Sequence, residues 1–457
     1  MKSLKVGLGI TCLLISISSC ATVQTDQEWD RLQTDVQKRL GEMLHWEQEE
    51  KDKAAIIEKV DELLTNKLTR EEAVQIALIN NRDLQHTLEE IGIAKSDLIQ
   101  AGLIHNPSLS AFFRLPTGGG GTNTEADGLI SISDIWQIPF RKKVASANLE
   151  MTMLKVQQAV LDTARKAKQA YDSLYYLGHA RTNMKQLLEK IKEISSEVQR
   201  RRDFGFLTEL DIYLAQIVET ETEIALHQVE SAHFQAKAHH DRVLGLGPDH
   251  IAYELAQEST DQLPEIPNVE QALAYAFNQR LDIQIEQLRI AEAERKLQLE
   301  KTRILKEVSI GVSYEREVEG DEVIGPGIDI QLPIFDQNQA QIAKRQFMLR
   351  RARRKLQALK GKVREEIIKD VDRISLQHKR CRLLREKIIP LRKNALAYTE
   401  KWVGAMQLNR LYLLETQKGL LESELEYLEA KRELSRALWD LELHLGGRLP
   451  KSYYPSN

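Results

Sequence analysis

Two patterns of hydrophobic and polar positions follow one another along this chain. Long stretches carry apolar residues at spacings of three and four, the period of an amphipathic α-helix, and short stretches alternate between apolar and polar, the period of a β-strand. The order is a helix, two short strands and a very long helical hairpin, and it occurs twice. The pattern therefore predicts a mainly α-helical protein with a small β part.

The two occurrences lie at a constant offset. The segment 71–85 recurs as 270–284, an offset of 270 − 71 = 199, and Gly205 recurs as Gly404, where 404 − 205 is again 199. A repeat of this length is far longer than the unit of a solenoid. It predicts an internal twofold repeat, with two structurally equivalent halves in one protomer.

The helical stretches are long and only narrowly apolar. Lys143 to Asp203 contains no proline, and roughly 60 residues at about 1.5 Å each predict a rod of roughly 90 Å. Narrow apolar stripes on otherwise charged helices predict coiled-coil-like, side-by-side packing. Pro390 predicts a kink or an interruption, whereas its counterpart at 390 − 199 = 191 is Ile191. The stripes are Leu187, Ile191, Ile194 and Val198; Leu356, Leu359, Val363 and Ile367; and Leu434, Leu438, Leu441 and Leu445.

Four stretches alternate strongly enough to predict strands. The outgoing strands are 108–115 and 308–315, and the returning strands are 129–138 and 327–334, with a glycine-containing turn inside each pair. Asp134 interrupts the apolar face of its strand. The apolar positions are Leu109, Ala111, Phe113 and Leu115; Ile130, Ile132, Trp136 and Ile138; Val308, Ile310, Val312 and Tyr314; and Ile328, Ile330, Leu332 and Ile334.

Such strands suit a membrane-spanning β-barrel, which needs segments of about ten residues with one apolar and one polar face. Four strands cannot close a barrel, because backbone groups at an open edge have no partner in lipid and single-chain barrels begin at about eight strands. Several chains must therefore pool their strands, which predicts an oligomer. The alternative is two small soluble hairpins that cap a helical protein.

The N-terminus predicts export and a lipid anchor. Met1 to Lys5 carries two lysines, Val6 to Ile17 is mostly apolar, and Ile17-Ser18-Ser19-Cys20 follows where a signal peptidase would cut. We interpret residues 1–19 as a lipoprotein signal peptide and Cys20 as the acylated first residue of the mature chain, a site for palmitate. The alternative is an ordinary secretory signal with an incidental cysteine.

Composition and motifs favour neither catalysis nor nucleic-acid binding. The net charge is −4, 29% of the residues are charged and the mean hydropathy is −0.40, so the chain has no general attraction for nucleic acid. The glycine run near residue 120 lacks the lysine of a phosphate-binding loop. Cys381 has no partner for a disulfide or a zinc site. We predict no enzyme, no catalytic residue, no cofactor and no metal site. His239, His240 and His378 lie on charged helices without the glutamate and the spacing of a zinc protease. The residues interpreted as solvated helix faces are Glu365, Glu366, Arg350, Arg351, Arg353 and Arg354.

These elements divide the chain into successive segments. We expect residues 26–66, which have no second copy, to form a helix that leads away from the anchor. The segments are a signal peptide at 1–19, an anchor and helical segment at 20–67, a first repeat at 68–247 with a hairpin at about 106–139, a linker at 248–268, a second repeat at 269–447 with a hairpin at about 307–334, and a tail at 448–457.

Several short motifs mark the starts and ends of these elements. They are Leu68-Thr69-Arg70-Glu71-Glu72-Ala73 before Asn80-Asn81, Ala101-Gly102-Leu103-Ile104-His105-Asn106-Pro107-Ser108-Leu109, Gln137-Ile138-Pro139-Phe140 and Gln331-Leu332-Pro333-Ile334. In this order they resemble the TolC-type outer-membrane channel family, in particular its lipidated members. The resemblance covers nearly the whole mature chain. It implies a homotrimer in which long coiled-coil-like hairpins form a periplasmic α-barrel and the four transmembrane strands of each chain join one shared trimeric β-barrel.

The resemblance also implies a function. Such a protein is the exit duct of a tripartite efflux system in the outer membrane of a Gram-negative-type bacterium, passively conducting solutes from an inner-membrane efflux pump and a periplasmic adaptor (membrane fusion) protein. The alternative is a lipid-anchored periplasmic helical adaptor or scaffold without a pore, which would need a lipoyl-like domain that we do not find. The motif Pro139-Phe140-Arg141-Lys142-Lys143 is similar to that of metal-cation efflux members, but ducts generally leave the choice of substrate to the pump.

Opposite charges occupy matching positions near the expected hairpin tips. Gly205 and Gly404 interrupt long helical patterns and predict the tip turns. Six residues beyond each lie Asp211 and Arg410. The resemblance implies a periplasmic entrance closed by polar contacts just past this turn, where Asp211 matches an aspartate of the family, whereas Arg410 and Leu413 depart from it. We hypothesise that Asp211 and Arg410 meet across neighbouring hairpins as a gate; the alternative is that each is solvated on its own helix.

Overall fold

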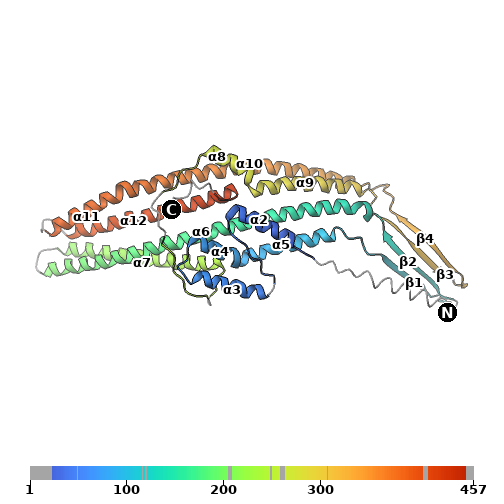
Figure 1. Cartoon of the computed structure of the whole chain (residues 1–457), viewed down its shortest axis with the longest axis horizontal. Coiled ribbons are helices and arrows are strands. Elements are labelled where there is room, and N and C mark those ends of the chain that lie inside the picture. The colour runs from blue at the N-terminus through green and yellow to red at the C-terminus, as the bar shows by residue number, and fades with distance from the viewer. Residues whose placement is uncertain are drawn as a thin grey trace. The chain divides into compact units, whose positions relative to one another are not determined.

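The computed structural model describes most of the chain in two compact units. Each unit takes segments from both halves of the sequence (Figure 1). Unit 1 comprises Met1–Leu32, Glu89–Val156 and Gln284–Gln357, and unit 2 comprises Gln33–Leu88, Gln157–Ile283 and Ala358–Asn457. The signal peptide, Cys20 and Gly205 lie outside the described residues. The described residues are 23–48, 50–115, 117–118, 121–203, 208–247, 250–257, 263–305, 307–404 and 410–448.

Helices account for most of the described chain, and four strands complete it. None of the helices among the described residues is both long and apolar enough to cross a membrane. The helices are α2 (Asp26–Leu40), α3 (Glu50–Leu64), α4 (Arg70–Asn80), α5 (Arg82–Gln100), α6 (Asp134–Asp203), α7 (Glu209–Leu244), α8 (Val269–Gln279), α9 (Leu281–Thr302), α10 (Gln339–Leu383), the π-helical turn η1 (Leu384–Ile388), α11 (Ile389–Gly404) and α12 (Arg410–Leu445). The strands are β1 (Ser108–Arg114), β2 (Asn123–Ser131), β3 (Val308–Arg316) and β4 (Glu322–Ile330).

The strands of unit 1 form one antiparallel sheet in the order β1-β2-β3-β4. The hairpin of the first half therefore pairs directly with the hairpin of the second half through β2 and β3. In that pairing Ile130 lies opposite Ile310, and in the next pairing Ile310 lies opposite Ile328. Apolar residues of three strands thus form one cross-strand row, which is the unit of side-chain packing in a sheet.

The two outgoing strands begin where they were predicted, but both returning strands were placed too late. Strand β2 covers residues 123–131 rather than 129–138, and β4 covers 322–330 rather than 327–334. The backbone of β1 sets the start of β2, because Asn123 must lie opposite Arg114. The first residues of β2 are mostly polar, and the polar face of the sheet accommodates them. Because they do not alternate with apolar residues, the sequence pattern did not mark them as a strand.

Asp134 does not lie in a strand, which corrects the expectation that it interrupts an apolar strand face. It is the first residue of α6, and the side chain is buried. Its carboxylate accepts a hydrogen bond of 2.7 Å from the backbone N–H of His105 and pairs with Arg141 at 3.0 Å. A carboxylate at a helix N-terminus is stabilised by the helix dipole. The residues predicted as the end of the strand are therefore the first turns of α6.

The predicted apolar stripes are the packing surfaces of the long helices. All four stripe residues of α6 and all four of α12 are buried. In the stripe of α10, Val363 and Ile367 are fully buried, while Leu356 and Leu359 are half-buried. The spacing of three and four therefore predicted the buried faces, which confirms the side-by-side packing of these helices.

The interruption predicted at Pro390 takes the form of a π-helical turn. Residues Leu384–Ile388 adopt the wider π geometry between α10 and α11, and the backbone N–H of Ile389 donates to the carbonyl of Leu384. Proline lacks an N–H and its ring collides with the preceding turn, so a wider turn accommodates it without breaking the helix. The first half has Ile191 at the matching position, where α6 continues without interruption.

The segment 26–66 forms two helices rather than the single helix expected. Gly41 has a φ of 75° and follows the last residue of α2, so the chain leaves the helix there in the left-handed conformation that glycine adopts at low cost. The next helix, α3, begins at Glu50. Glycine is a common stop signal for a helix, so Gly41 marked this boundary in the sequence.

The Asn80-Asn81 motif has a structural role in unit 2. Asn80 donates to the carbonyls of Leu244 and Gly245 at 3.0 Å each, and Asn81 donates to that of Val243 at 2.7 Å. These carbonyls end α7 and lack helical partners, so the two amides replace the missing hydrogen bonds. Gly245 has a φ of 72°, and a Cβ there would collide with the Asn80 carbonyl. The motif thus fixes α4 against the end of the first hairpin.

Candidate functional site

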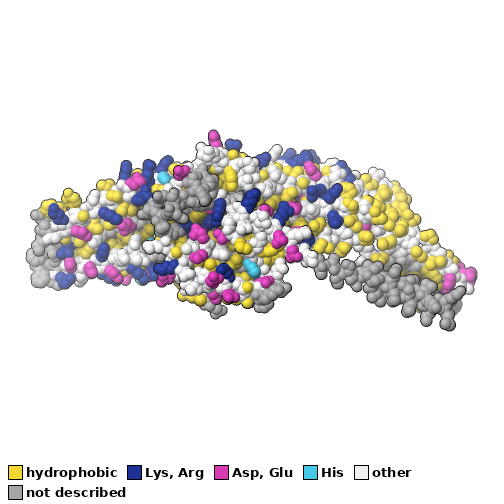
Figure 2. Space-filling model, in the orientation of Figure 1, with side chains coloured by type: hydrophobic (Ala, Val, Ile, Leu, Met, Phe, Trp, Pro, Cys, Tyr) yellow, Lys and Arg dark blue, Asp and Glu magenta, His cyan; other side chains and the backbone are white. Residues whose placement is uncertain are grey.

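The four-stranded sheet has one apolar face. Residues directly opposite one another in antiparallel strands point to the same side, so the register assigns every side chain to a face. Several apolar side chains are exposed on this face, including Val312 at 51% and Ile328 at 66%. Figure 2 shows hydrophobic side chains gathered over these strands. The face comprises Leu109, Ala111, Phe113, Thr124, Ala126, Gly128, Ile130, Val308, Ile310, Val312, Tyr314, Ile324, Pro326, Ile328 and Ile330, with the charged Arg316 and Glu322 at its end where β3 leads into β4.

The opposite face of the sheet is predominantly polar. Asn123 donates to Glu315 across the β2–β3 pair at 3.1 Å, and Arg114 pairs with Glu125 at 2.7 Å. Phe112, Leu129 and Val323 are its apolar exceptions. A sheet with two such faces can separate an apolar medium from water. The polar members are Ser108, Ser110, Arg114, Asn123, Glu125, Asp127, Ser131, Ser309, Ser313, Glu315 and Asp329.

In unit 2, the ends of the two long hairpins pack through one apolar cluster. It joins α6 and α7 of the first half to α11 and α12 of the second half. The cluster lies on the apolar side of each helix, opposite the charged surface, as expected from narrow apolar stripes. Its buried members are Met184, Leu187, Leu188, Ile191, Ile194, Val198, Ile212, Ala215, Val218, Leu226, Val403, Leu413, Leu414 and Leu421.

Arg410, one of the two predicted gate residues, forms an ion pair with Glu197. Arg410 is the first residue of α12, and Glu197 lies near the end of α6. The arginine side chain is 22% exposed and the glutamate side chain 40% exposed. The pair therefore links the first half to the second at the hairpin ends, just beyond the apolar cluster. Partial burial makes such a pair stronger than an exposed one.

Asp211, the other predicted gate residue, caps its own helix. Its carboxylate accepts hydrogen bonds from the backbone N–H of Thr208 at 2.8 Å and from the Thr208 hydroxyl at 2.7 Å. The Asp211 N–H donates in return to that hydroxyl, which completes a capping box at the start of α7. Gly404, a predicted tip turn, is the last residue of α11. Within this chain Arg410 pairs with Glu197 and Asp211 binds Thr208, and the predicted contact between Asp211 and Arg410 stays a prediction.

Further ion pairs connect the hairpin helices along their exposed sides. Lys418 of α12 pairs with Glu221 of α7 at 2.8 Å, and this hydrogen bond raises the pKa of Lys418. Lys185 of α6 pairs with Glu230 of α7 at 2.9 Å, and this hydrogen bond lowers the pKa of Glu230. Such solvent-screened pairs contribute little to stability. They orient the helices, while the apolar cluster holds them together.

Sequence reasoning missed Glu197, and the repeat explains why. The matching position in the second half, 197 + 199 = 396, is Leu396, so no paired signal marks the glutamate. Glu197 and Arg410 come together only because the two hairpins pack against each other. A charge pair between helices so distant in sequence leaves no local spacing pattern.

The metal-ligating and thiol side chains of the described residues do not gather into a site. Among them, no group of three or more His, Cys, Asp or Glu side chains could hold a metal ion. Cys381 is a buried thiol on α10, and burial raises its pKa to about 11. A thiol with so high a pKa stays protonated and unreactive near neutral pH. Buried His240 contacts the Tyr253 hydroxyl through Nδ1 at 2.7 Å, which fixes the linker rather than a ligand.

Comparison with known proteins assigns the fold to a class. No family model matches the chain. The cobalt-zinc-cadmium resistance protein CzcC of Cupriavidus metallidurans is 21% identical over 389 residues, which cover 83% of this chain and 90% of CzcC. A membrane protein from Pseudomonas aeruginosa has a TM-score of 0.71 at 17% identity, covering 83% and 90% of the two chains. The Campylobacter jejuni CmeC outer membrane channel has a TM-score of 0.68 at 15% identity, covering 83% and 85%.

The chain has the fold of the TolC-type outer-membrane channels, as its motifs indicated. The matched part of the chain covers 85% of the CmeC outer membrane channel and 90% of the Pseudomonas aeruginosa membrane protein. The fold class predicted from the sequence is thereby confirmed. Among particular proteins, the chain is similar in sequence to CzcC along 90% of that protein's length.

Proposed function

We propose that this protein is the outer-membrane exit duct of a tripartite efflux system. The observation that carries the proposal is the two-faced sheet, in which one face is predominantly apolar and the other predominantly polar over the four strands. An apolar face suits lipid and a polar face suits a water-filled lumen. The similarity in fold to outer-membrane channels supports this reading.

We further propose a homotrimer. A sheet of four strands leaves β1 and β4 as open edges, and open edges are not tolerated in lipid. Three copies would supply 3 × 4 = 12 strands and could join β4 of one copy to β1 of the next. The hairpins of unit 2 would form the periplasmic part, where an adaptor protein and an inner-membrane pump would dock. Cys20 would add a lipid anchor in the outer membrane.

The hairpin ends are the proposed periplasmic gate. Arg410 is held by Glu197 of the same chain, so outward movement of α12 would have to break this pair. Asp211 would act by fixing the start of α7 and, in the form predicted from the sequence, by facing Arg410 of a neighbouring hairpin. Both contacts place a charged lock beyond the apolar cluster. Two double variants distinguish these contacts. If Glu197 holds Arg410, a charge reversal at both of these residues should restore closure; if Asp211 holds it, a charge reversal at Asp211 and Arg410 should do so.

Reconstitution into planar bilayers tests the proposed duct. The purified full-length protein should migrate as a heat-modifiable oligomer on gels, and an Arg410→Glu variant should conduct ions in steps of uniform size. The alternative, a lipid-anchored helical adaptor or scaffold, predicts no conductance from either protein. Absence of conductance from the wild-type protein and the variant alike, both correctly assembled, would favour the scaffold over the duct, whereas equal conductance of the two proteins would exclude only the Arg410 lock.

Divalent cations are the cargo to test first. The name of CzcC refers to resistance to cobalt, zinc and cadmium, and this chain matches most of that protein. Deletion of the gene should then increase sensitivity to these metals, and re-expression should restore growth. A deletion strain sensitive only to organic compounds would keep the duct but change its substrate class.

A further inference from the structure

The first part of α10 carries a concentration of positive charge that the rest of the fold does not explain. Residues 339–364 contain ten Lys or Arg and no Asp or Glu, whereas the matching residues 140–165 contain five Lys or Arg and two acidic residues. Figure 2 shows Lys and Arg side chains gathered along this part of the molecule. The asymmetry between two equivalent halves indicates a role that only the second half has.

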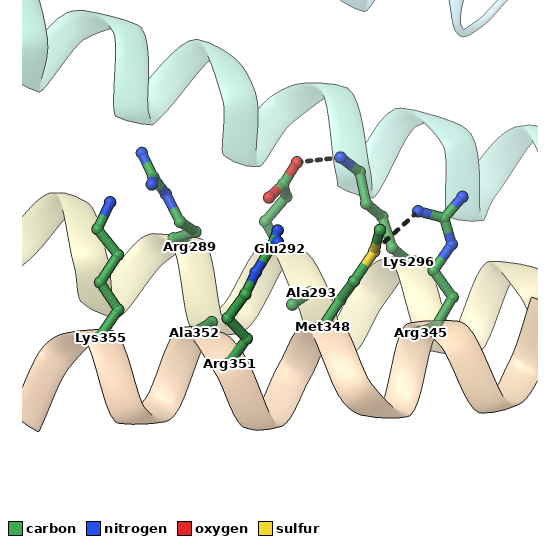
Figure 3. Close-up of a pocket in the computed structure, with 9 residues that line it drawn as sticks. All are labelled: Arg289, Glu292, Ala293, Lys296, Arg345, Met348, Arg351, Ala352 and Lys355. Carbon is green, nitrogen blue, oxygen red and sulfur yellow. Dashed lines mark hydrogen bonds and ion pairs between the residues drawn. The ribbon is translucent and has the colours of Figure 1, made fainter.

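Part of this charge lines a cavity between α9 and α10, within unit 1. The cavity has a volume of about 360 Å³, in the range of small-molecule sites. Figure 3 shows lining side chains from both helices rising on the same side of the helix pair. The cavity is lined by Arg289, Glu292, Ala293 and Lys296 of α9 and by Arg345, Met348, Arg351, Ala352 and Lys355 of α10.

The carboxylates around the cavity do not neutralise its cations. Lys296 pairs with Glu292 at 2.5 Å, and Arg345 pairs with Glu300 at 3.1 Å. Glu286 serves two cations, Lys355 at 2.9 Å and Arg289 at 3.3 Å. Five cations against three carboxylates leave 5 − 3 = +2.

Arg351 is the cation with the greatest freedom to bind a ligand. It lines the cavity from α10 and is exposed, and within the described part of the chain no carboxylate pairs with it. Lys355 lies one turn further along the same helix and shares its carboxylate with Arg289. A guanidinium presents a planar fork to two oxygens of an oxyanion, and a lysine adds a point charge.

We propose that this cavity is a binding site for a phosphate monoester, with Arg351 and Lys355 as its principal ligands. The excess charge of +2 matches the dianion that a phosphate monoester forms near neutral pH. The cavity is larger than a bare phosphate group, so it has room for the first atoms of the ester. The ester can be a soluble metabolite or a lipid headgroup, because both present the same group.

Calorimetric titration of the full-length protein in detergent with glycerol 3-phosphate tests the soluble source. Nanodiscs of phosphatidylcholine with and without phosphatidic acid, followed by lipid analysis of the purified protein, test the lipid source. The double variant Arg351→Gln with Lys355→Gln should bind on the order of tenfold more weakly or worse. Its matched control is Arg350→Gln with Arg354→Gln, which removes the same charge at the same spacing from residues that do not line the cavity.

The outcomes distinguish specific binding in the cavity from nonspecific electrostatic attraction to the basic part of α10. Saturable binding that the control retains and the cavity variant loses supports the proposal, in whichever arm it occurs. Affinity should also rise between about pH 5 and 7, as the second phosphate proton with a pKa of about 6 is lost. Equal weakening in both variants, or no saturable binding in either arm, would overturn it. If the double variant misfolds, Arg351→Gln alone decides, because this arginine has no ion pair to lose among the described residues.

Discussion

Arginine at position 312 tests whether the apolar face of the sheet lies against lipid. Val312 is the middle residue of the nine-residue strand β3. Nine residues at about 3.3 Å each extend roughly 30 Å, and a tilt of about 40° reduces the height to roughly 23 Å, close to the roughly 25 Å apolar band of transmembrane barrels. Val312 should therefore lie near the middle of the membrane, where a charge is most costly.

The expected cost follows from this depth. Arginine on the lipid face costs about 2 to 4 kcal/mol near the midplane, so three copies would cost roughly 6 to 12 kcal/mol per trimer. That is comparable with the whole free energy of unfolding of a typical domain, about 5 to 15 kcal/mol. We expect Val312→Arg to abolish assembly in the outer membrane. Ile310→Arg, two residues closer to the end of the strand, should impair assembly less.

Ser313→Arg is the matched control, because it adds the same charge one residue away on the opposite face. Ser313 lies opposite Asp127 on one side and Gly325 on the other, so an arginine there has a carboxylate and space nearby. The assay measures the heat-modifiable oligomer in outer-membrane fractions on unheated gels. If both variants assemble equally, or if only Ser313→Arg fails, the apolar face does not contact lipid and the proposed duct loses its main support.

Three further changes test the anchor, the sheet and the gate. Cys20→Ser should abolish metabolic labelling with a fatty acid; equal labelling of both proteins would remove the lipoprotein hypothesis. Gly311→Ala should destabilise the sheet by about 1 to 3 kcal/mol, since the added Cβ would collide with the Gly128 carbonyl. Gly327→Ala is the control, because a Cβ there meets no atom within 4 Å, and denaturant unfolding compares the stability of the two variants. Arg410→Glu should raise the resting single-channel conductance, and adding Glu197→Arg should restore closure. Unchanged conductance in the single variant would exclude the Glu197–Arg410 pair as the gate.

The helices and the outgoing strands could be predicted because the spacing of their apolar residues follows the faces that these elements form. Ile191 and Val198 are fully buried at the spacing that predicted them. Strands β1 and β3 begin at the predicted residues because each alternates along its own length. In these elements the side chains carry the information, so local sequence is sufficient.

The returning strands could not be placed in the same way. The start of β2 is set by its hydrogen-bonded partner, and backbone pairing tolerates polar side chains on the polar face. Residues 132–138 look like a continued strand because Ile132, Trp136 and Ile138 alternate, yet helix α6 begins at Asp134. The buried carboxylate of Asp134 in the first turn of this helix binds His105, which is remote in sequence, and Arg141, two turns further along. Tertiary partners, not local periodicity, decide these boundaries.

The repeat constrains the two halves unequally. Backbone geometry is repeated, because two hairpins must pair in one sheet and two long hairpins must share one apolar cluster. Chemistry is not repeated: Pro390 introduces a π-helical turn where the first half has Ile191, Arg410 replaces the capping carboxylate of Asp211, and the first part of α10 is far more basic than its counterpart. At these three places the packing of the helices does not require the same side chain in both halves. The departures therefore fall at a bend, at the proposed gate and at the proposed phosphate site, where the second half is free to take a separate role.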